Sequence, residues 1–337
     1  MSRKNDQGGA AASPINFVSP VAGHALPQLD EASIDREAAA WAAFKTVVVE
    51  YEPQRRIKLR IEGVRRTALP MPRGEPLPGA RLSQVSQAGK TWTLRSYIAE
   101  LHASAAAAGL QPNPLRVIYV GLKRRISVKM LYQRILKELG DPHSHDANVN
   151  VEVLAQRGQE LIVEKGVELL IVDEVQHLAN KTTDNKSVTD ELKSFVDDGL
   201  VPVIWAGNED SREFFEENQQ LAARLGTAIE LDPVNPKRSR EIRLFRKFLA
   251  DLDAGILATG LVDRPAGLDR EVIVRGLGKA AGGHVGRVCR IVEEAIRFMA
   301  RRGGTFIEPY DLSWAVRHYA MPAKWLVANP FPEPEDW

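Results

Sequence analysis

Two stretches of sequence decide the fold of this chain: QVSQAGKT at residues 84–91 and LLIVDE at residues 169–174. The first stretch lies between a short apolar segment and a helical pattern, and it ends as phosphate-cradling loops end. The second is an aliphatic run closed by two adjacent carboxylates, which is typical of a buried strand in a parallel sheet. Because ligands bind at the carboxyl ends of parallel strands, the two stretches predict one site at one edge of a sheet.

The loop at residues 84–91 predicts a site for the phosphates of a nucleotide. In such loops backbone N–H groups and a helix N-terminus point at phosphate oxygens, a lysine contacts the terminal phosphates and a hydroxyl binds Mg²⁺. The expected binding residues are Ser86, Gln87, Ala88, Gly89, Lys90 and Thr91. The motif G-x-x-x-x-G-K-[ST] begins with a glycine, but this chain has Gln84 there. Gly-Lys-Thr alone also occurs by chance, so the interpretation depends on the second stretch.

The two carboxylates after the aliphatic run fit the second half of a nucleoside triphosphate site. Asp173 is expected to hold Mg²⁺ together with Thr91, largely through water, and Glu174 is expected to polarise the attacking water as a general base. The alternative is a strand that ends in a solvated acidic turn. The order of the two stretches, each on the required element, favours the site, with ATP and Mg²⁺ as cofactors.

Three more residues are candidates for ATP hydrolysis. Asn208 closes the next apolar strand and either holds the attacking water or caps the helix that follows. Arg224 ends that helix and is expected to reach a neighbouring subunit, whereas Arg287 begins a later helix and is expected to report the nucleotide state. Each arginine, taken alone, is also compatible with an ordinary surface position.

The chain is expected to have four parts. A Gly-, Ala-, Ser- and Pro-rich arm at residues 1–33 is expected to be disordered, and a Pro-rich acidic tail at 323–337 is either a docking peptide or packs on its own domain. Residues 34–233 alternate apolar strands with helices, which predicts a parallel sheet with helices on both faces. Residues 234–322 carry only helical periodicity and predict an all-helical domain.

Within these parts, the local pattern predicts several elements. A helix is expected to begin after Ser33, and residues 55–78, with four prolines, are expected to wrap the core or form a lid over the nucleotide base. Strands are expected at residues 81–85, 116–121, 168–172, 201–206 and 227–231.

Composition excludes several classes of protein. The net charge of +1 over 337 residues gives no sign of a nucleic-acid partner, so only local clusters of charge can indicate one. One cysteine excludes an internal disulfide and suits a reducing compartment. The sequence has no run of eighteen apolar residues and no secretory signal, so a cytoplasmic protein without a membrane partner is expected.

The order of these motifs resembles that of the AAA+ ATPases. More narrowly, DEVQHL at 173–178, VIWAGN at 203–208 and QLAARL at 220–225 look like the TniB/TnsC group of transposition regulators. The resemblance covers about residues 35–320. It implies an AAA+ sheet with a C-terminal helical lid, a homo-oligomeric ring or filament on duplex DNA, and recruitment of a transposase and a TniQ-type adaptor.

Basic clusters supply the candidate DNA contacts. These are Lys123, Arg124 and Arg125 after the second strand, and Lys181 in a polar loop after Glu174. They would bind phosphates without reading sequence, although both clusters are also compatible with solvated surface. Two functions therefore stay open: a DNA-binding regulator of transposition, and a nucleotide-switched scaffold, of a signalling or clamp-loading kind, that acts on a protein partner without touching DNA.

Overall fold

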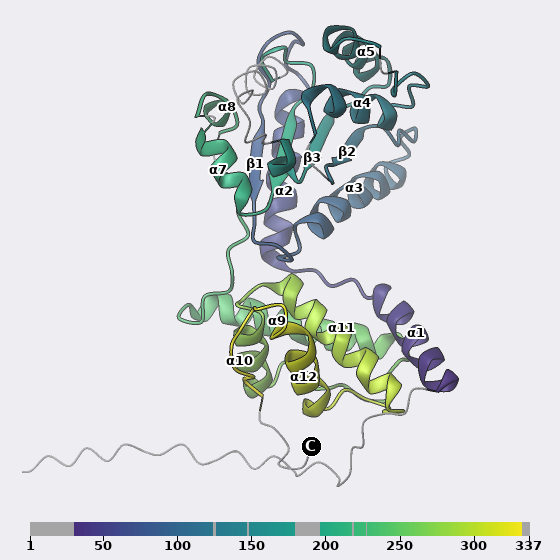
Figure 1. Ribbon diagram of the computed structural model, residues 1–337, viewed down its shortest axis with the longest axis vertical. Coiled ribbons are helices and arrows are strands. Elements are labelled where there is room, and N and C mark those ends of the chain that lie inside the picture. Colours follow the sequence, from purple (N-terminus) through teal and green to yellow (C-terminus); the bar gives the residue numbers. More distant parts are fainter. Residues whose placement is uncertain are drawn as a thin grey trace, which may run out of the picture.

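The computed structural model describes residues 30–123, 126–146, 148–178, 196–217, 219–226 and 228–331. The chain forms an α/β lobe and a helical lobe, joined by two extended segments (Figure 1). Most of the expected N-terminal arm, and the tail beyond residue 331, lie outside the described residues. Among the helices that are described, none has the length and apolar content needed to cross a membrane.

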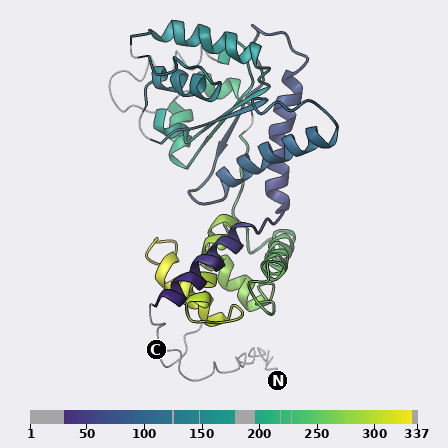
Figure 2. The same ribbon diagram turned by 90° about the vertical axis from the view of Figure 1, so that its right-hand side faces the viewer.

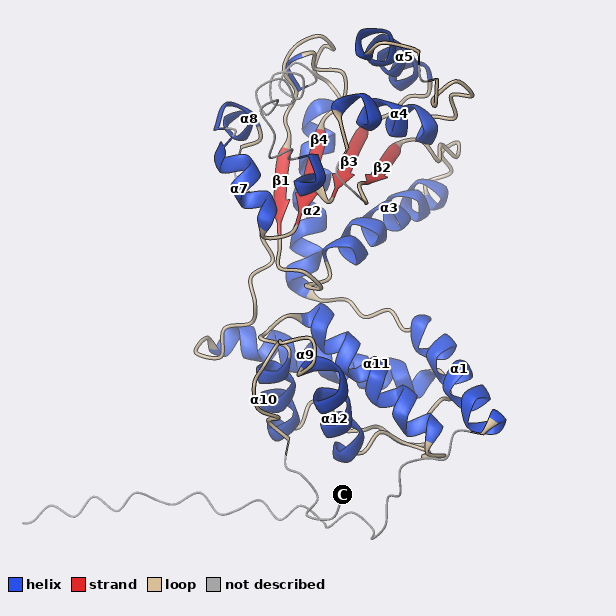
Figure 3. Ribbon diagram, viewed as in Figure 1, coloured by secondary structure: helices blue, strands red, loops and turns tan. Residues whose placement is uncertain are grey.

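A four-stranded parallel sheet forms the centre of the α/β lobe (Figure 3). Its strands are β1 (Ala80–Ser83), β2 (Val117–Gly121), β3 (Leu169–Asp173) and β4 (Val203–Gly207), in the order β1-β4-β3-β2. The expected fifth strand is reduced to an isolated parallel bridge between Ile229 and Leu82. The register pairs Gly121 with Asp173, so β2 and β3 end side by side.

Helices cover both faces of the sheet because its side chains alternate between two apolar clusters. Leu169 and Ile171 pack in the cluster on the side of α2 (Glu52–Ala68) and α3 (Lys90–Ala107). Leu170 and Val172 pack in the other cluster. Other helical elements that the structure describes in this lobe are α4 (Val128–Glu138), α5 (Val151–Glu164), η1 (Val175–Leu178), α7 (Asp210–Glu217) and α8 (Gln219–Arg224).

The segment expected to wrap the core or form a lid is instead largely helical. Residues 52–68 form α2, which buries Ile57 and Ile61, four residues apart, in the core. Pro53 lies in the first helical turn, where its missing N–H costs nothing, and the four other prolines follow the end of the helix. The prolines therefore mark the ends of a helix rather than its absence.

The helical lobe contains α9 (Ser239–Ala258), α10 (Glu271–Ala280), α11 (Val285–Arg301), α12 (Pro309–Ala315) and η2 (Val316–Ala320). Buried Asp253 of α9 organises the loop before α10. Its carboxylate accepts hydrogen bonds from the N–H groups of Ala266, Gly267 and Leu268, at 2.9, 2.7 and 3.1 Å.

The first helix belongs to the helical lobe. Helix α1 (Glu31–Lys45) packs along α11, far from the sheet (Figures 1 and 2). Glu37 lies 2.7 Å from both Arg297 and Arg301. The expectation that residues 34 onward belong to the α/β domain is therefore wrong for this helix. Its start also differs, because Asp30 is the N-cap and Ser33 closes a reciprocal capping box.

Candidate nucleotide site

The loop at residues 84–89 runs from β1 directly into α3. Gly89 is the N-cap of α3 and has a φ of 101°, a backbone conformation that favours glycine. Gln87 adopts a φ of 63°, which is uncommon for a residue with a side chain. The loop thus places the first N–H groups of α3 at the carboxyl edge of the sheet, as a phosphate-binding loop requires.

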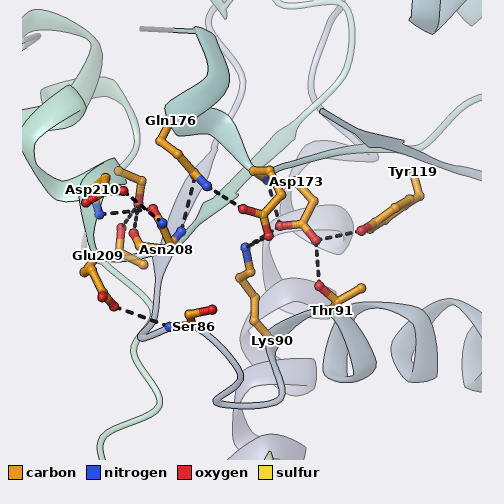
Figure 4. A network of polar contacts seen from close by, with 12 residues as sticks. Ser86, Lys90, Thr91, Tyr119, Asp173, Gln176, Asn208, Glu209 and Asp210 are labelled. Atoms are coloured by element: carbon orange, nitrogen blue, oxygen red, sulfur yellow. Dashed lines mark hydrogen bonds and ion pairs between the residues drawn. The ribbon is translucent and has the colours of Figure 1, made fainter. Parts of the chain in front are cut away.

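Lys90 connects this loop to the end of β3. Its Nζ lies 2.6 Å from Asp173 Oδ1 and 2.9 Å from Glu174 Oε1 (Figure 4). Lys90 is 7% exposed and Asp173 is 1% exposed, so this ion pair is shielded from water, whereas the Glu174 side chain is 36% exposed. The structure brings together the three residues that the sequence analysis expected to meet at one site.

Asp173 is the most heavily hydrogen-bonded carboxylate of the site. Its Oδ2 accepts from the Thr91 hydroxyl at 3.0 Å and from the Tyr119 hydroxyl at 2.6 Å, and its Oδ1 accepts from the Glu174 N–H at 2.8 Å. Burial raises the pKa of Asp173, but the charge of Lys90 and the hydrogen bonds outweigh burial and lower the pKa overall. The residue therefore stays a carboxylate at neutral pH.

A hydroxyl and a carboxylate that lie in contact are the hard oxygen ligands that Mg²⁺ prefers, so Thr91 and Asp173 fit this cation. Within the described residues no group of three or more His, Cys, Asp or Glu side chains could hold a metal ion.

Glu174 is held in a strained position. Its φ is 63°, in the left-handed region, and its side chain accepts hydrogen bonds from Lys90 and from Gln176 Nε2. Gln176 also accepts a hydrogen bond from the Asn208 N–H at 3.3 Å, which links Glu174 to the end of β4. The polar network therefore spans three strand ends.

The Asn208 side chain caps the following helix in this structure. Its Oδ1 accepts from the Asp210 N–H at 3.0 Å, and its Nδ2 donates to Asp210 Oδ2 at 3.0 Å (Figure 4). Of the two roles considered for Asn208, the cap is the one that its contacts form. A role in holding water remains a prediction.

The two candidate arginines have different surroundings. Arg224 pairs with Asp197 of its own chain, with a 3.0 Å contact between Nη2 and Oδ2. Arg287 lies in the first turn of α11, its guanidinium 5.0 Å from the centre of the Trp325 ring. Burial lowers the pKa of Arg287, partly offset by the charge of Glu209, and its Nε is buried with no hydrogen-bond partner in the described part of the chain.

The helical lobe contacts the phosphate loop at Gly286 of α11 and at Tyr319 of η2, whose hydroxyl donates to Gln87 Oε1 at 3.4 Å. A Cβ added to Gly286 would lie 2.6 Å from Gly89 N and 2.7 Å from Ala88 C, and closer still to the Gln87 carbonyl oxygen. Real Cβ atoms essentially never approach this closely. Only glycine therefore lets α11 lie directly on the loop.

Gln84, the departure from the loop motif, is 3% exposed. Its N–H donates to the Gly207 carbonyl at 3.1 Å and so extends the pairing of β1 with β4. Both polar atoms of its side chain are buried, with no hydrogen-bond partner among the described residues.

Of the candidate DNA contacts, only Lys123 is described, and it is exposed just after β2. Arg124, Arg125 and Lys181 lie outside the described residues.

Three residues of the site escaped the sequence analysis: Tyr119, Gln176 and Gly286. A tyrosine in an otherwise aliphatic strand and a glutamine two residues after Glu174 were visible signals, because both interrupt apolar patterns. The role of Gly286 carries no local signal, since it depends on a partner about two hundred residues away in sequence.

A family model described as "Bacterial TniB protein" matches residues 48–233, more than half of the chain. The structure is similar to that of Aeropyrum pernix ORC1 in complex with DNA, with a TM-score of 0.59 and 18% identity over 82% of this chain and 68% of that chain. It is also similar to Cdc6p from Pyrobaculum aerophilum, with a TM-score of 0.59 and 16% identity over 81% of this chain and 69% of that chain.

A third similar structure is Aeropyrum pernix ORC2 in ADPNP–ADP complexes, with a TM-score of 0.53 and 16% identity over 87% of this chain and 69% of that chain. No curated protein sequence matches the chain. At these identities the likeness to the solved structures shows a shared fold.

Proposed function

This chain belongs to the TniB family and is an AAA+ ATPase, and from that premise we propose that it assembles with ATP on duplex DNA and marks target sites for a transposase. A TniQ-type adaptor is the other protein partner in this proposal, and hydrolysis resets the assembly. The observation that carries the proposal is the polar cluster in which Lys90 and Thr91, at the start of α3, contact Asp173 and Glu174 at the end of β3.

The proposed site divides its work among these residues. The loop N–H groups and Lys90 bind the phosphates of ATP, and Thr91 and Asp173 hold Mg²⁺, which neutralises charge on the phosphates when it is bound. Glu174 accepts a proton from the attacking water. Since the phosphates and Glu174 compete for the same Lys90 ammonium group, ATP binding frees Glu174 for that role.

A neighbouring subunit completes the site in this proposal. Arg224 ends α8, and its side chain is 32% exposed, so it can exchange Asp197 for a phosphate of the next protomer. Within each protomer, Arg287 reaches the γ-phosphate from α11 and links nucleotide state to the helical lobe. Asn208 holds the attacking water after its side chain turns away from Asp210.

DNA contacts are assigned to the basic segment after β2. Lys123, Arg124 and Arg125 follow a sheet-edge strand and would line a channel in an assembled ring or filament, with Lys181 as a further contact. These contacts are to phosphates, so binding should weaken steeply with salt.

A charge-reversal variant tests the DNA contacts. The triple change Lys123→Glu, Arg124→Glu and Arg125→Glu is compared with the wild type by fluorescence anisotropy on labelled duplex DNA, with a non-hydrolysable ATP analogue, over a salt series. The slope of log affinity against log salt should become shallower by about 2 to 3, because each lost phosphate contact removes about 0.9.

The matched control reverses three scattered, ion-paired surface charges: Arg66→Glu, Lys165→Glu and Lys247→Glu. It changes net charge equally and should leave the slope near that of the wild type. If the triple variant after β2 assembles and binds DNA like the control, the nucleotide-switched scaffold with a protein partner becomes the better account.

A further inference from the structure

Tyr119 of β2 is built into the nucleotide site, although it belongs to neither of the two motifs. Its hydroxyl donates to Asp173 Oδ2 at 2.6 Å, the same oxygen that accepts from Thr91 at 3.0 Å (Figure 4). With Lys90 and the Glu174 N–H on Oδ1, both oxygens of the buried carboxylate are fixed. Tyr119 supplies the only one of these contacts that comes from β2.

The backbone around Tyr119 is suited to this contact. Gly121 lies two residues further along β2, on the same face, and the register sets it beside Asp173. A Cβ added to Gly121 would lie 3.4 Å from Tyr119 Cε1 and 3.8 Å from the hydroxyl oxygen. The ring therefore lies along the strand over Gly121, which brings its hydroxyl to Asp173.

Packing alone does not fix the Tyr119 ring. Tyr119, Arg95 and Glu138 line part of a cavity of about 320 Å³ at the edge of the sheet, so part of the ring borders open space. The Arg95 guanidinium lies 5.4 Å from the ring centre, a cation–π contact. The hydrogen bond to Asp173 is thus a main constraint on where the ring lies.

We propose that Tyr119 is a positioning residue for Mg²⁺: its hydroxyl orients the Asp173 carboxylate so that Asp173 and Thr91 together present oxygen atoms to the cation of bound Mg–ATP. This inference rests on the proposed role of Thr91 and Asp173 in holding Mg²⁺. A hydrogen bond to a ligating carboxylate fixes its direction, and loss of such a bond typically weakens metal affinity about 10- to 100-fold.

The test is a magnesium titration of nucleotide binding, which needs no turnover. A fluorescent ATP analogue is bound to the wild type and to Tyr119→Phe, first with EDTA and then with increasing free Mg²⁺. In EDTA the two proteins should bind the analogue equally. The Mg²⁺ concentration at half-maximal tightening should rise about tenfold in Tyr119→Phe.

Two further variants set the scale. Tyr97→Phe removes another tyrosine hydroxyl, which donates to Glu62 Oε2 at 2.8 Å and does not contact Thr91 or Asp173. The magnesium midpoint of this variant should equal that of the wild type. Gly121→Ala keeps the Tyr119 hydroxyl and adds a methyl in ordinary van der Waals contact with the ring, 3.4 Å from Cε1, so its magnesium midpoint should also stay near that of the wild type.

The outcomes separate the two proposals. An unchanged magnesium midpoint in Tyr119→Phe, or weaker binding already in EDTA, would overturn the role of Tyr119 while leaving the Mg²⁺ site intact. If wild-type binding does not respond to Mg²⁺ at all, the proposed cation site itself fails, and the inference about Tyr119 fails with it.

Discussion

Replacing Gly286 by alanine should slow ATP hydrolysis without lowering the melting temperature of the protein. The added methyl would lie 2.6 Å from Gly89 N, about 0.8 Å short of the 3.4 Å at which ordinary contact begins. The facing atoms are all backbone of the phosphate loop, so no flexible side chain can yield. Either α11 moves away from the loop or the loop itself deforms.

The size of the effect follows from that displacement. A shift approaching 1 Å at the phosphates can lower a rate about 100-fold, because it misaligns every group that the loop and α11 position. Helix propensity acts in the opposite direction, since alanine in a helix is favoured over glycine by about 1 kcal/mol. We therefore expect Gly286→Ala to lose ATPase activity about 10- to 100-fold while its melting temperature stays near that of the wild type.

A coupled ATPase assay and thermal unfolding, run on the same preparations, measure both quantities. Gly278→Ala is the matched control. Gly278 lies inside α10, and an added methyl there would come within 4 Å only of Phe245, at 3.7 Å. This control should keep full activity. If Gly286→Ala hydrolyses ATP within twofold of the wild-type rate, α11 does not rest on the loop during turnover and the reasoning is refuted.

Three other predictions concern single substitutions of charged residues. Lys90→Ala should lose ATP binding and DNA-dependent assembly together, measured by analogue fluorescence and by sedimentation with duplex DNA; normal assembly would contradict nucleotide gating. Glu174→Gln should assemble with ATP yet hydrolyse it at least about 100-fold more slowly, as loss of a general base does, and unimpaired hydrolysis in a phosphate-release assay would place the base elsewhere. Glu62→Gln should make the free energy of unfolding less dependent on pH in acid. Burial raises the pKa of Glu62, but hydrogen bonds from Arg65, Arg66 and Tyr97 outweigh burial and lower the pKa to about 2. The wild type should therefore lose more unfolding free energy than Glu62→Gln as the pH falls from about 4.5 to 2. If denaturant titrations show equal losses for the two proteins, the ionised Glu62 carboxylate does not contribute to stability.

Much of the nucleotide site could be predicted from sequence because its parts sit at the ends of regular elements. The aliphatic run before Asp173 required a buried strand, and a parallel sheet brings its carboxyl end beside the loop that contains Lys90. The cap formed by Asn208 could also be predicted, as one of two alternatives, because it depends on only three consecutive residues.

The features that escaped prediction depend on distant partners. The local pattern predicts a helix near α1, but nothing in that pattern says whether Ala40 and Phe44 pack on the sheet or on α11, which lies about 250 residues further along the chain. The contact of Tyr119 with Asp173 depends on strand register, and a one-residue slip would point the ring to the other face. Local pattern fixes elements, whereas these contacts are fixed by packing.

Packing also determines which other elements would shift if the phosphate loop moved. Helix α11 is continuous from Val285 to Arg301, and its first turn touches the loop at Gly286. Along the same helix, Arg297 and Arg301 each lie 2.7 Å from Glu37 of α1. Because close-packed helices tend to move as rigid units, a displacement at the phosphates that shifts α11 would carry α1 with it. If nucleotide binding moves α11, we therefore expect the N-terminal helix to move as well.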